Sequence, residues 1–501
     1  MMLRILTLLC ACSSLLLLLA CSESNPVSQG CTQASDCTDQ VCKIEPGDAL
    51  GGICVDCLVS DDCPSDTPFC DVASNSCLLP SCEQGADGDA LCMSATPDTP
   101  VCGPDGRCVE CVESSHCSNE SEPICDTETG ECRGCEAHAE CASSVCDIEG
   151  GTCRAEADLV YVDDNGTDGA SCGTPLSPCA TFMGADGALT KVGGSRDTIV
   201  VQTGSIVEQV LIDSMQLTIV GQAGAALTPQ IPSDEIGIAI TDSATVTISG
   251  LRISMDVQGD RTIAVACTGN STLTLEDSLI DRVKNGISTN NCSLTLLRSD
   301  LRGSSSTSET TGIEVAGGEV ALHQSTITSY RGGGIRIDSA SFEIVNCLIA
   351  NNGNDSTELG SPFGGILLSG TLGDQRFEFN TVAHNFIQPQ QTIGSAIECA
   401  DANLNGSNNI FTLDGAPLGL STLIGANCSL QDSLIEGGHP GEGNIDDTPI
   451  FVPAADDYHL AAGSPGIDVA VGGTEVAIDI DGDARPQGAR RDMGMDEVLV
   501  Q

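Results

Sequence analysis

The sequence predicts an all-β protein in which a parallel β-helix follows a set of small disulfide-rich repeats. Twenty of the 30 cysteines lie between Cys31 and Cys153 in five groups of four, and strand-like segments with alternating apolar residues recur through the rest of the chain. Only 2% of the residues are aromatic. The core of the predicted β-helix therefore has to be built from Val, Ile, Leu and Ala.

The charge of the chain limits its partners. The formal net charge is -52, with 71 acidic residues and 19 basic ones, so we expect no nucleic acid partner. An acidic ligand would need a bridging cation. Tryptophan is absent and tyrosine is rare, which removes the usual stacking platforms for sugars and bases. A glycan or protein ligand would have to be held mainly by polar contacts.

Residues 1–20 have the form of an export signal. Arg4 is the only charge in the first 22 residues, and an apolar stretch follows it. The Leu-Leu-Ala-Cys sequence that ends at Cys21 resembles the lipobox of bacterial lipoproteins. That resemblance implies cleavage before Cys21, acylation of its sulfur and insertion into membrane lipid, and Ser22 favours the outer membrane. The localisation it implies is the cell envelope, periplasmic or surface-exposed. An uncleaved membrane anchor is the alternative.

A polar linker, residues 21–30, leads into five cysteine-rich repeats over residues 31–154. An exported chain with so few apolar residues between its cysteines favours disulfides, and the repeats resemble the four-cysteine repeats of large exported bacterial lipoproteins. The spacing of Cys108, Cys111, Cys132 and Cys135 also suits a zinc ribbon. The pairing within each group stays open. The groups begin at Cys31, Cys57, Cys82, Cys111 and Cys135.

Periodic strands dominate the second half of the chain. Five nine-residue segments start 21 to 27 residues apart, at Thr245, Thr272, Ser293, Glu319 and Ser341. Their alternating pattern indicates a strand with one buried face, and a variable period is typical of stacked coils with loops of different length. A second strand recurs once per turn. The ninth position would form an aliphatic column through the core, made of Ile253, Ile280, Leu301, Ile327 and Ile349.

Two stretches carry a resemblance to known families. The segment "LVYVDDNGTDGASCGTPLSPCATF", with the strands after it, resembles the opening of right-handed parallel β-helix proteins of the pectin-lyase-like fold. The segments "DDTPIFVPAADDYHLAAGSPGIDVA" and "DIDGDARPQGARRDMGMDE" resemble the C-terminal part of choice-of-anchor Q domain proteins. The resemblance implies a β-helix over residues 158–445 and, over residues 446–501, a cap that we expect to cover the end of the helix.

Six of the remaining cysteines are predicted to form disulfides, and four of these occupy matching places on successive turns. Cys267 and Cys292 lie on successive turns, as do Cys399 and Cys428, so we predict two disulfides between coils. Cys172 and Cys179 would close a local loop near the first coil.

Cys347 is expected to be a small buried residue, because Ser278, Ser299 and Ser325 stand at the same place in other coils.

Calcium sites are suggested at two places, of which the weaker is Asp163, Asp164 and Asp168. Asp479, Asp481 and Asp483 alternate and could offer oxygens to Ca²⁺. A purely structural turn explains the same pattern. No other cofactor is indicated.

Catalytic candidates are weak. Asp277 and Asp281 are each offset by 21 residues from Arg298 and Arg302 on the next turn. Acidic and basic residues on one face serve polysaccharide lyases of this fold, but exposed salt bridges between coils are the simpler explanation.

The sequence therefore favours a lipid-anchored cell-envelope protein that presents a non-catalytic β-helix on a disulfide-rich stalk and binds a glycan or a protein. The alternative is a polysaccharide lyase or glycoside hydrolase of the pectin-lyase-like class, which is supported by fold analogy alone.

Overall fold

The computed structural model describes residues 101–499 with short gaps, together with parts of the first three repeats. The predicted signal peptide and Cys21 lie outside the described residues. The chain divides into two compact units, residues 1–134 and 135–501. Within the described residues, no helix is long and apolar enough to cross a membrane. The gaps are 230–234, 256–261, 305–309, 355–360, 371–372, 388–392, 403, 413–421 and 473–474, and the parts before residue 101 are 30–31, 37, 40–43, 52–59, 62–63, 69–71, 75–78, 82, 86–95 and 97–100.

Each cysteine repeat contains a short antiparallel hairpin and two disulfides, and in the first repeat a third strand, β1, joins the hairpin. In all five repeats the first cysteine bonds to the third and the second to the fourth, as in Cys111–Cys125 and Cys117–Cys132. The cysteines of the alternative zinc ribbon thus bond to other partners. The strands are β1 Gly30–Cys31, β2 Val41–Lys43, β3 Gly52–Val55, β4 Phe69–Asp71, β5 Ser76–Leu78, β6 Val101–Cys102, β7 Cys108–Val109, β8 Ile124–Asp126, β9 Glu131–Arg133, β10 Cys146–Asp147 and β11 Thr152–Cys153.

The hairpin turn places one residue in the left-handed region two positions before the fourth cysteine. Gly106 and Gly130 have φ of 77° and 76° there, which glycine adopts without strain. Their carbonyls accept the N–H of the first cysteine of the repeat, at 2.9 Å from Cys82 and 3.2 Å from Cys111. The third repeat differs by a helix, α1 Ala86–Ala95, in its longer first loop.

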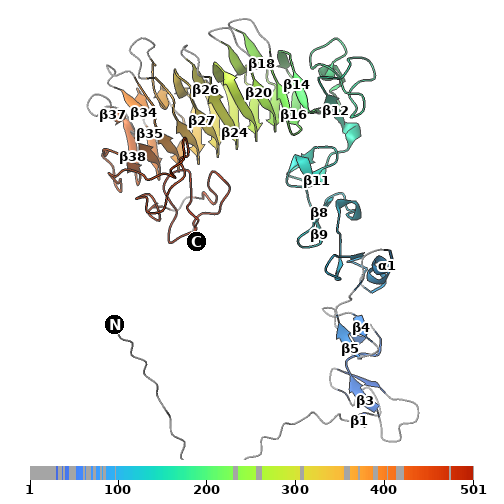
Figure 1. Cartoon of the computed structure of the whole chain (residues 1–501). Helices are drawn as coiled ribbons and strands as arrows, with labels where there is room; N and C mark the ends of the chain where they lie inside the picture. The colour runs from blue at the N-terminus through green and yellow to red at the C-terminus, as the bar shows by residue number, and fades with distance from the viewer. Residues whose placement is uncertain are drawn as a thin grey trace, which may run out of the picture. The chain divides into compact units, whose positions relative to one another are not determined.

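Residues 159–435 form a parallel β-helix in which each coil contributes strands to three parallel ladders (Figure 1). Ladders 1 and 2 merge into one sheet of 18 strands, because the long strands β24 (Asn285–Leu297) and β26 (Thr311–His323) run through both. Ladder 3 is a separate sheet of 10 strands. The coils are therefore stacked at the strand spacing of about 4.8 Å.

The strand bounds follow the three ladders. Ladder 1 contains β15 Val210–Asp213, β18 Ile236–Thr241, β21 Ile263–Thr268, the first halves of β24 and β26, β28 Gly333–Asp338, β31 Ile366–Ser369, β34 Gly394–Ala400 and β37 Thr422–Ile424. Ladder 2 contains β12 Leu159–Val162, β13 Thr198–Val201, β16 Gln216–Gly221, β19 Thr245–Ser249, β22 Thr272–Glu276, the second halves of β24 and β26, β29 Ser341–Val345, β32 Gln375–Glu378, β35 Leu404–Ser407 and β38 Cys428–Gln431. Ladder 3 contains β14 Gly204–Ile206, β17 Ala225–Leu227, β20 Arg252–Ser254, β23 Leu279–Val283, β25 Asp300–Gly303, β27 Thr326–Thr328, β30 Leu348–Ala350, β33 Thr381–Ala383, β36 Ile410–Thr412 and β39 Leu434–Ile435. Beyond residue 100, the described part of the chain has 3₁₀ helices at Ser114–His116, His138–Glu140, Glu156–Asp158 and Ala188–Lys191.

The predicted aliphatic column is confirmed. Its members are neighbours in register from coil to coil and are fully buried in ladder 3. Each nine-residue segment, however, is two short strands rather than one. A residue with positive φ forms the corner between them, as at Asp277 (47°), Arg298 (46°) and Asn346 (53°).

A column of polar side chains runs beside the aliphatic one. The hydroxyl of Ser299 accepts the N–H of Ser278 at 3.2 Å and donates to the carbonyl of Leu297 at 3.0 Å. Cys347 stands in this column two coils after Ser299. Its thiol donates to the carbonyl of Val345 at 3.3 Å. Cys347 is the free cysteine of the described residues, and burial raises the pKa of its thiol to about 12.

The predicted coil disulfides are present. Cys267 is bonded to Cys292 and Cys399 to Cys428, each between successive coils. Cys172–Cys179 closes the loop that pairs with β12 at the first coil. These bonds tie neighbouring coils and the first edge of the helix together.

The C-terminal segment, residues 446–499, covers a flank of the β-helix rather than its end, as Figure 1 shows in brown. The last coil is instead paired by the residues just before this segment, since the N–H of Ile435 donates to the carbonyl of Ile445 at 2.9 Å. The physical reason lies in ladder 3. Its outward side chains are polar in the middle coils, as at Asp281 and Thr328, whereas later coils also present Leu348, Ala350, Ala383 and Ile410. Tyr458 and Met495 pack on this apolar surface, which is formed by Leu348, Ala350 and Ala383.

The fifth cysteine repeat packs on the outer face of ladder 2 at the first coils. Val145 lies in one apolar cluster with Leu159, Tyr161, Val200 and Val220. The phenol of Tyr161 donates to the carbonyl of Ser143 at 3.2 Å. This repeat is therefore part of the second compact unit.

Candidate functional site

The outer face of ladder 2 is covered at its first coils and open beyond them. The fifth repeat covers the first coils, and Val476 of the C-terminal segment packs on Val345 and Phe379 at the corner that ends β29 and β32. The open part holds a groove of about 390 Å³ over β24, β26, β29 and β32.

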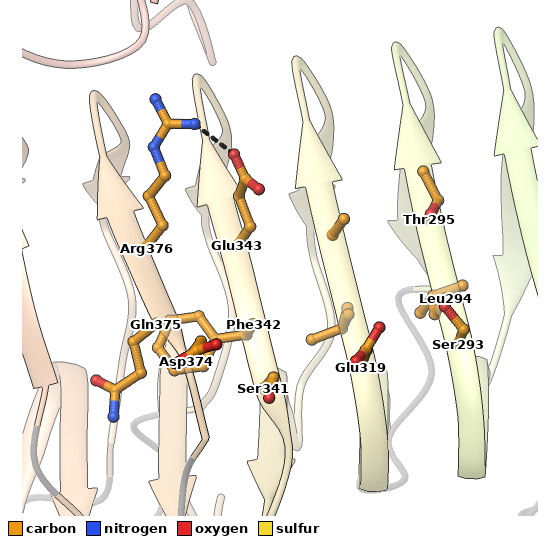
Figure 2. A pocket seen from close by; sticks show the side chains of 12 residues that line it. Ser293, Leu294, Thr295, Glu319, Ser341, Phe342, Glu343, Asp374, Gln375 and Arg376 are labelled. Carbon is orange, nitrogen blue, oxygen red and sulfur yellow. Dashed lines mark hydrogen bonds and ion pairs between the residues drawn. The ribbon is translucent and has the colours of Figure 1, made fainter. Parts of the chain in front are cut away.

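Small side chains form the floor of this groove. Thr247, Thr274, Thr295 and Ala321 are neighbours in register on four successive coils. The column continues with Glu343 and then Arg376. Figure 2 shows Thr295, Glu343 and Arg376 along one face of these strands. Because the floor residues are short and their neighbours long, the face is hollowed where they lie.

Charged side chains line the groove at its far end. The guanidinium of Arg376 contacts Glu343 at 2.5 Å and Glu378 at 3.4 Å (Figure 2 draws the first contact). Burial lowers the pKa of the neighbouring His323, against the attraction of Glu343. His323 therefore adds little positive charge at neutral pH.

Two further carboxylates stand apart from this network. Glu319 and Asp374 line the groove and are exposed. Within the described part of the chain, neither side chain makes a hydrogen bond or an ion pair. Glu319 lies between Ser293 and Ser341 in register, so hydroxyl groups flank it on both sides.

The four weak catalytic candidates do not come together. Arg298 binds Asp277 through two bonds of 2.7 and 2.8 Å, as predicted, and that contact raises the pKa of Arg298. Asp281 and Arg302 are neighbours in register but bind elsewhere: Asp281 pairs with Arg252, and Arg302 pairs with Asp300 at 2.7 Å. Each of the four side chains is thus held in an ion pair, either within its own coil or with a neighbouring coil. This favours the interpretation as salt bridges over a catalytic cluster.

The predicted calcium residues form a closed turn. One carboxylate oxygen of the buried Asp479 accepts the N–H of Asp481 at 3.0 Å and of Asp483 at 2.8 Å. Its other oxygen accepts the N–H of Glu497 at 3.0 Å. Asp481 contacts the imidazole of His459. This arrangement favours the structural turn over a cation site.

Further acidic residues of the C-terminal segment are used in the same way. Asp492 accepts N–H groups from Asp468 and Val498 at 2.7 and 2.9 Å. Glu497 accepts the N–H of Asp492 and pairs with Arg485 at 3.2 Å, with both side chains of this pair almost fully buried. Burial raises the pKa of Asp492 to about 6.

A second cavity of about 630 Å³ lies between ladder 3 and the C-terminal segment. His459 lines it, with Nδ1 at 2.6 Å from Asp457 and Nε2 at 2.8 Å from Asp481. Burial opposes the charged ring, but Asp457 and Asp481 hold the pKa of His459 above its usual value. Since both ring nitrogens already face carboxylates, this histidine is a link between two loops of the segment.

The sequence patterns did not single out the groove residues. Alternation in the segment that starts at Glu319 does place Glu319 and Ala321 on the outer face. What it could not show is that the first coils would be covered, because that cover comes from residues near 145.

The comparisons with known proteins support the fold. The model of the right handed beta helix region matches residues 263–428, and that of a family of unknown function, DUF8331, matches residues 46–159. Together with the parallel ladders, the first match confirms the predicted all-β fold with a right-handed parallel β-helix. No curated protein matches the chain.

Solved structures of similar architecture are distant in sequence. A pectate lyase, Pel9A, is 13% identical with a TM-score of 0.46, covering 68% of this chain and 96% of its own. A rhamnogalacturonan lyase is 13% identical with a TM-score of 0.32, covering 55% and 87%. The pectin methylesterase PemA from Erwinia chrysanthemi is 12% identical with a TM-score of 0.27, covering 58% and 92%.

Proposed function

We propose that the protein is a lipid-anchored protein of the cell envelope whose β-helix binds an extended polysaccharide without cleaving it. The anchor rests on the sequence around Cys21. The binding site is the groove on ladder 2, and the observation that carries the proposal is its floor of small side chains on the open part of this face.

The dimensions of the groove favour a polysaccharide. From Thr295 to Arg376 the groove advances three coils, about 14 Å at the strand spacing. In an extended polysaccharide, the distance between successive sugar rings is close to the distance between successive coils. An extended peptide presents side chains to one face every ~6.7 Å, which does not match the coils.

The polar lining favours the same ligand. Hydroxyl and carboxylate groups form hydrogen bonds with sugar hydroxyls, and no aromatic stacking platform stands on the described outer face of the groove. Asp277 and Arg298 are engaged in an exposed ion pair, and Asp281 and Arg302 pair with other residues, which supports binding over turnover. Catalysis is the competing outcome of the test below.

The experiment is a binding and turnover panel with the whole chain and soluble polysaccharides of neutral, basic and acidic type. Ala321→Tyr fills the floor and should abolish binding. Ala239→Tyr is the matched control, because Ala239 faces outward on ladder 1 (β18). Binding that survives Ala321→Tyr, or release of sugar products by the wild type, would refute the proposal.

The anchor has its own test. Mass spectrometry of the N-terminal peptide should find acyl chains on the sulfur of Cys21. An unmodified thiol there would rule the anchor out and leave the groove proposal untouched.

A further inference from the structure

We infer that the groove on ladder 2 selects a cationic polysaccharide, a hexosamine polymer with free amino groups. This inference rests on the proposed binding function and adds the chemical class of the ligand.

The charge balance of the groove is the first argument. Glu319, Glu343 and Asp374 line it, and Glu378 follows on β32. Against these four carboxylates stands one guanidinium, Arg376, which is shared between Glu343 and Glu378. Two carboxylates, Glu319 and Asp374, therefore remain available to a ligand. An acidic polymer would meet repulsion from them and from a chain with a formal net charge of -52.

The placement of the two open carboxylates is the second argument. Glu319 is in register with Ser341, and the N–H of Phe342 donates to the carbonyl of Asp374 at 2.9 Å, so Asp374 lies one coil beyond Ser341. The two carboxylates are thus two coils apart, about 9.6 Å at the strand spacing. In a flat β-1,4-linked chain successive sugars face opposite ways, so that amino groups on one edge recur at every second sugar. Glu319 and Asp374 match that repeat.

The third argument is the energetics of exposed charges. Each ammonium–carboxylate contact in a half-open groove is screened by salt and contributes modestly. Two such contacts at fixed spacing still distinguish an amino sugar from its N-acetylated form, which carries no charge. We expect each contact to change affinity about fivefold.

The test titrates the whole chain with three hexamers: glucosamine, N-acetylglucosamine and galacturonate, the last with and without Ca²⁺. The variants are Glu319→Gln, Asp374→Asn and the double variant. Glu314→Gln is the matched control, since Glu314 lies on β26 but faces outward on ladder 1. The glucosamine hexamer should bind tightest. Each groove variant should weaken it about fivefold and the double variant about 25-fold, with no change for Glu314→Gln or for the acetylated hexamer.

The outcomes separate the two proposals. Equal affinity for the amino and acetylated hexamers, with both lost in Ala321→Tyr, would overturn the charge selection and keep the groove. Calcium-dependent binding of the galacturonate hexamer that needs Glu319 and Asp374 would overturn the inference in favour of an acidic ligand bridged by a cation. Binding that Ala321→Tyr leaves intact would remove the groove itself.

Discussion

Carboxylates serve opposite purposes in the C-terminal segment and in the groove on ladder 2. In the segment, Asp479 and Asp492 are buried, and their oxygens accept N–H groups that hold loops together. In the groove, Glu319 and Asp374 are exposed and make no such bonds in the part of the chain that the structure describes. The comparison teaches that the local supply of N–H donors decides whether an acidic residue of this protein supports the fold or remains available to a ligand.

The largest effect should come from the buried ion pair of the segment. Arg485→Met would leave Glu497 buried without its partner and would remove bonds of 3.0 and 2.8 Å to the carbonyls of Asp492 and Gly494. We expect a loss of about 3–5 kcal/mol, measured by urea unfolding and by faster hydrogen exchange in the segment. The exposed Arg490→Met is the control, and an equal loss there would contradict the assignment.

A pH-dependent gain in the free energy of unfolding is expected from Asp492. Its folded-state pKa of about 6 lies above the value in the unfolded chain, so the folded protein binds the extra proton and this group stabilises the fold as pH falls from 7 to 4. Relative to Asp492→Asn, the wild type should gain on the order of 2 kcal/mol over that range. Parallel stability curves for the two proteins between pH 4 and 7 would show that Asp492 titrates normally.

A smaller effect is expected at Cys347. Cys347→Ser keeps a donor toward the carbonyl of Val345, so its unfolding free energy should stay within about 1 kcal/mol of the wild type. Cys347→Ala removes the donor and should cost about 1–2 kcal/mol. Chemical denaturation of both variants compares their unfolding free energies directly. A larger loss for Cys347→Ser than for Cys347→Ala would argue against the polar column.

The smallest effect is expected at Tyr330. Its buried hydroxyl has no hydrogen-bond partner within the described residues, and burial raises the pKa of the phenol. Tyr330→Phe should leave the unfolding midpoint unchanged or raise the stability by up to about 1 kcal/mol. A clear loss of stability would reveal a partner for the hydroxyl.

Sequence patterns predicted what repeats along the chain. The coil period, the aliphatic column from Ile253 to Ile349 and the place of Cys347 all follow from matching positions on successive coils. The corner at Arg298 was not predicted, because arginine carries no obvious preference for positive φ.

The packing of the C-terminal segment on the β-helix could not be predicted from the sequence for a different reason. That residues 446–499 lie along ladder 3 depends on which outward side chains are apolar in the last coils, and Leu348 or Ala383 cannot be assigned to an outer face until the register is known. The groove likewise depends on which residues of neighbouring coils lie in register, so Glu319 and Asp374 could be placed along one groove only once the fold was known.

The double variant with Glu319→Gln and Asp374→Asn tests the contrast between the two sets of carboxylates most directly. Its affinity for the glucosamine hexamer is measured together with its thermal midpoint. Our account predicts an unchanged or slightly higher midpoint, since no fold contact is lost, and an affinity about 25-fold weaker. A lowered midpoint with unchanged affinity would contradict it, because these two carboxylates would then support the fold as those of the C-terminal segment do.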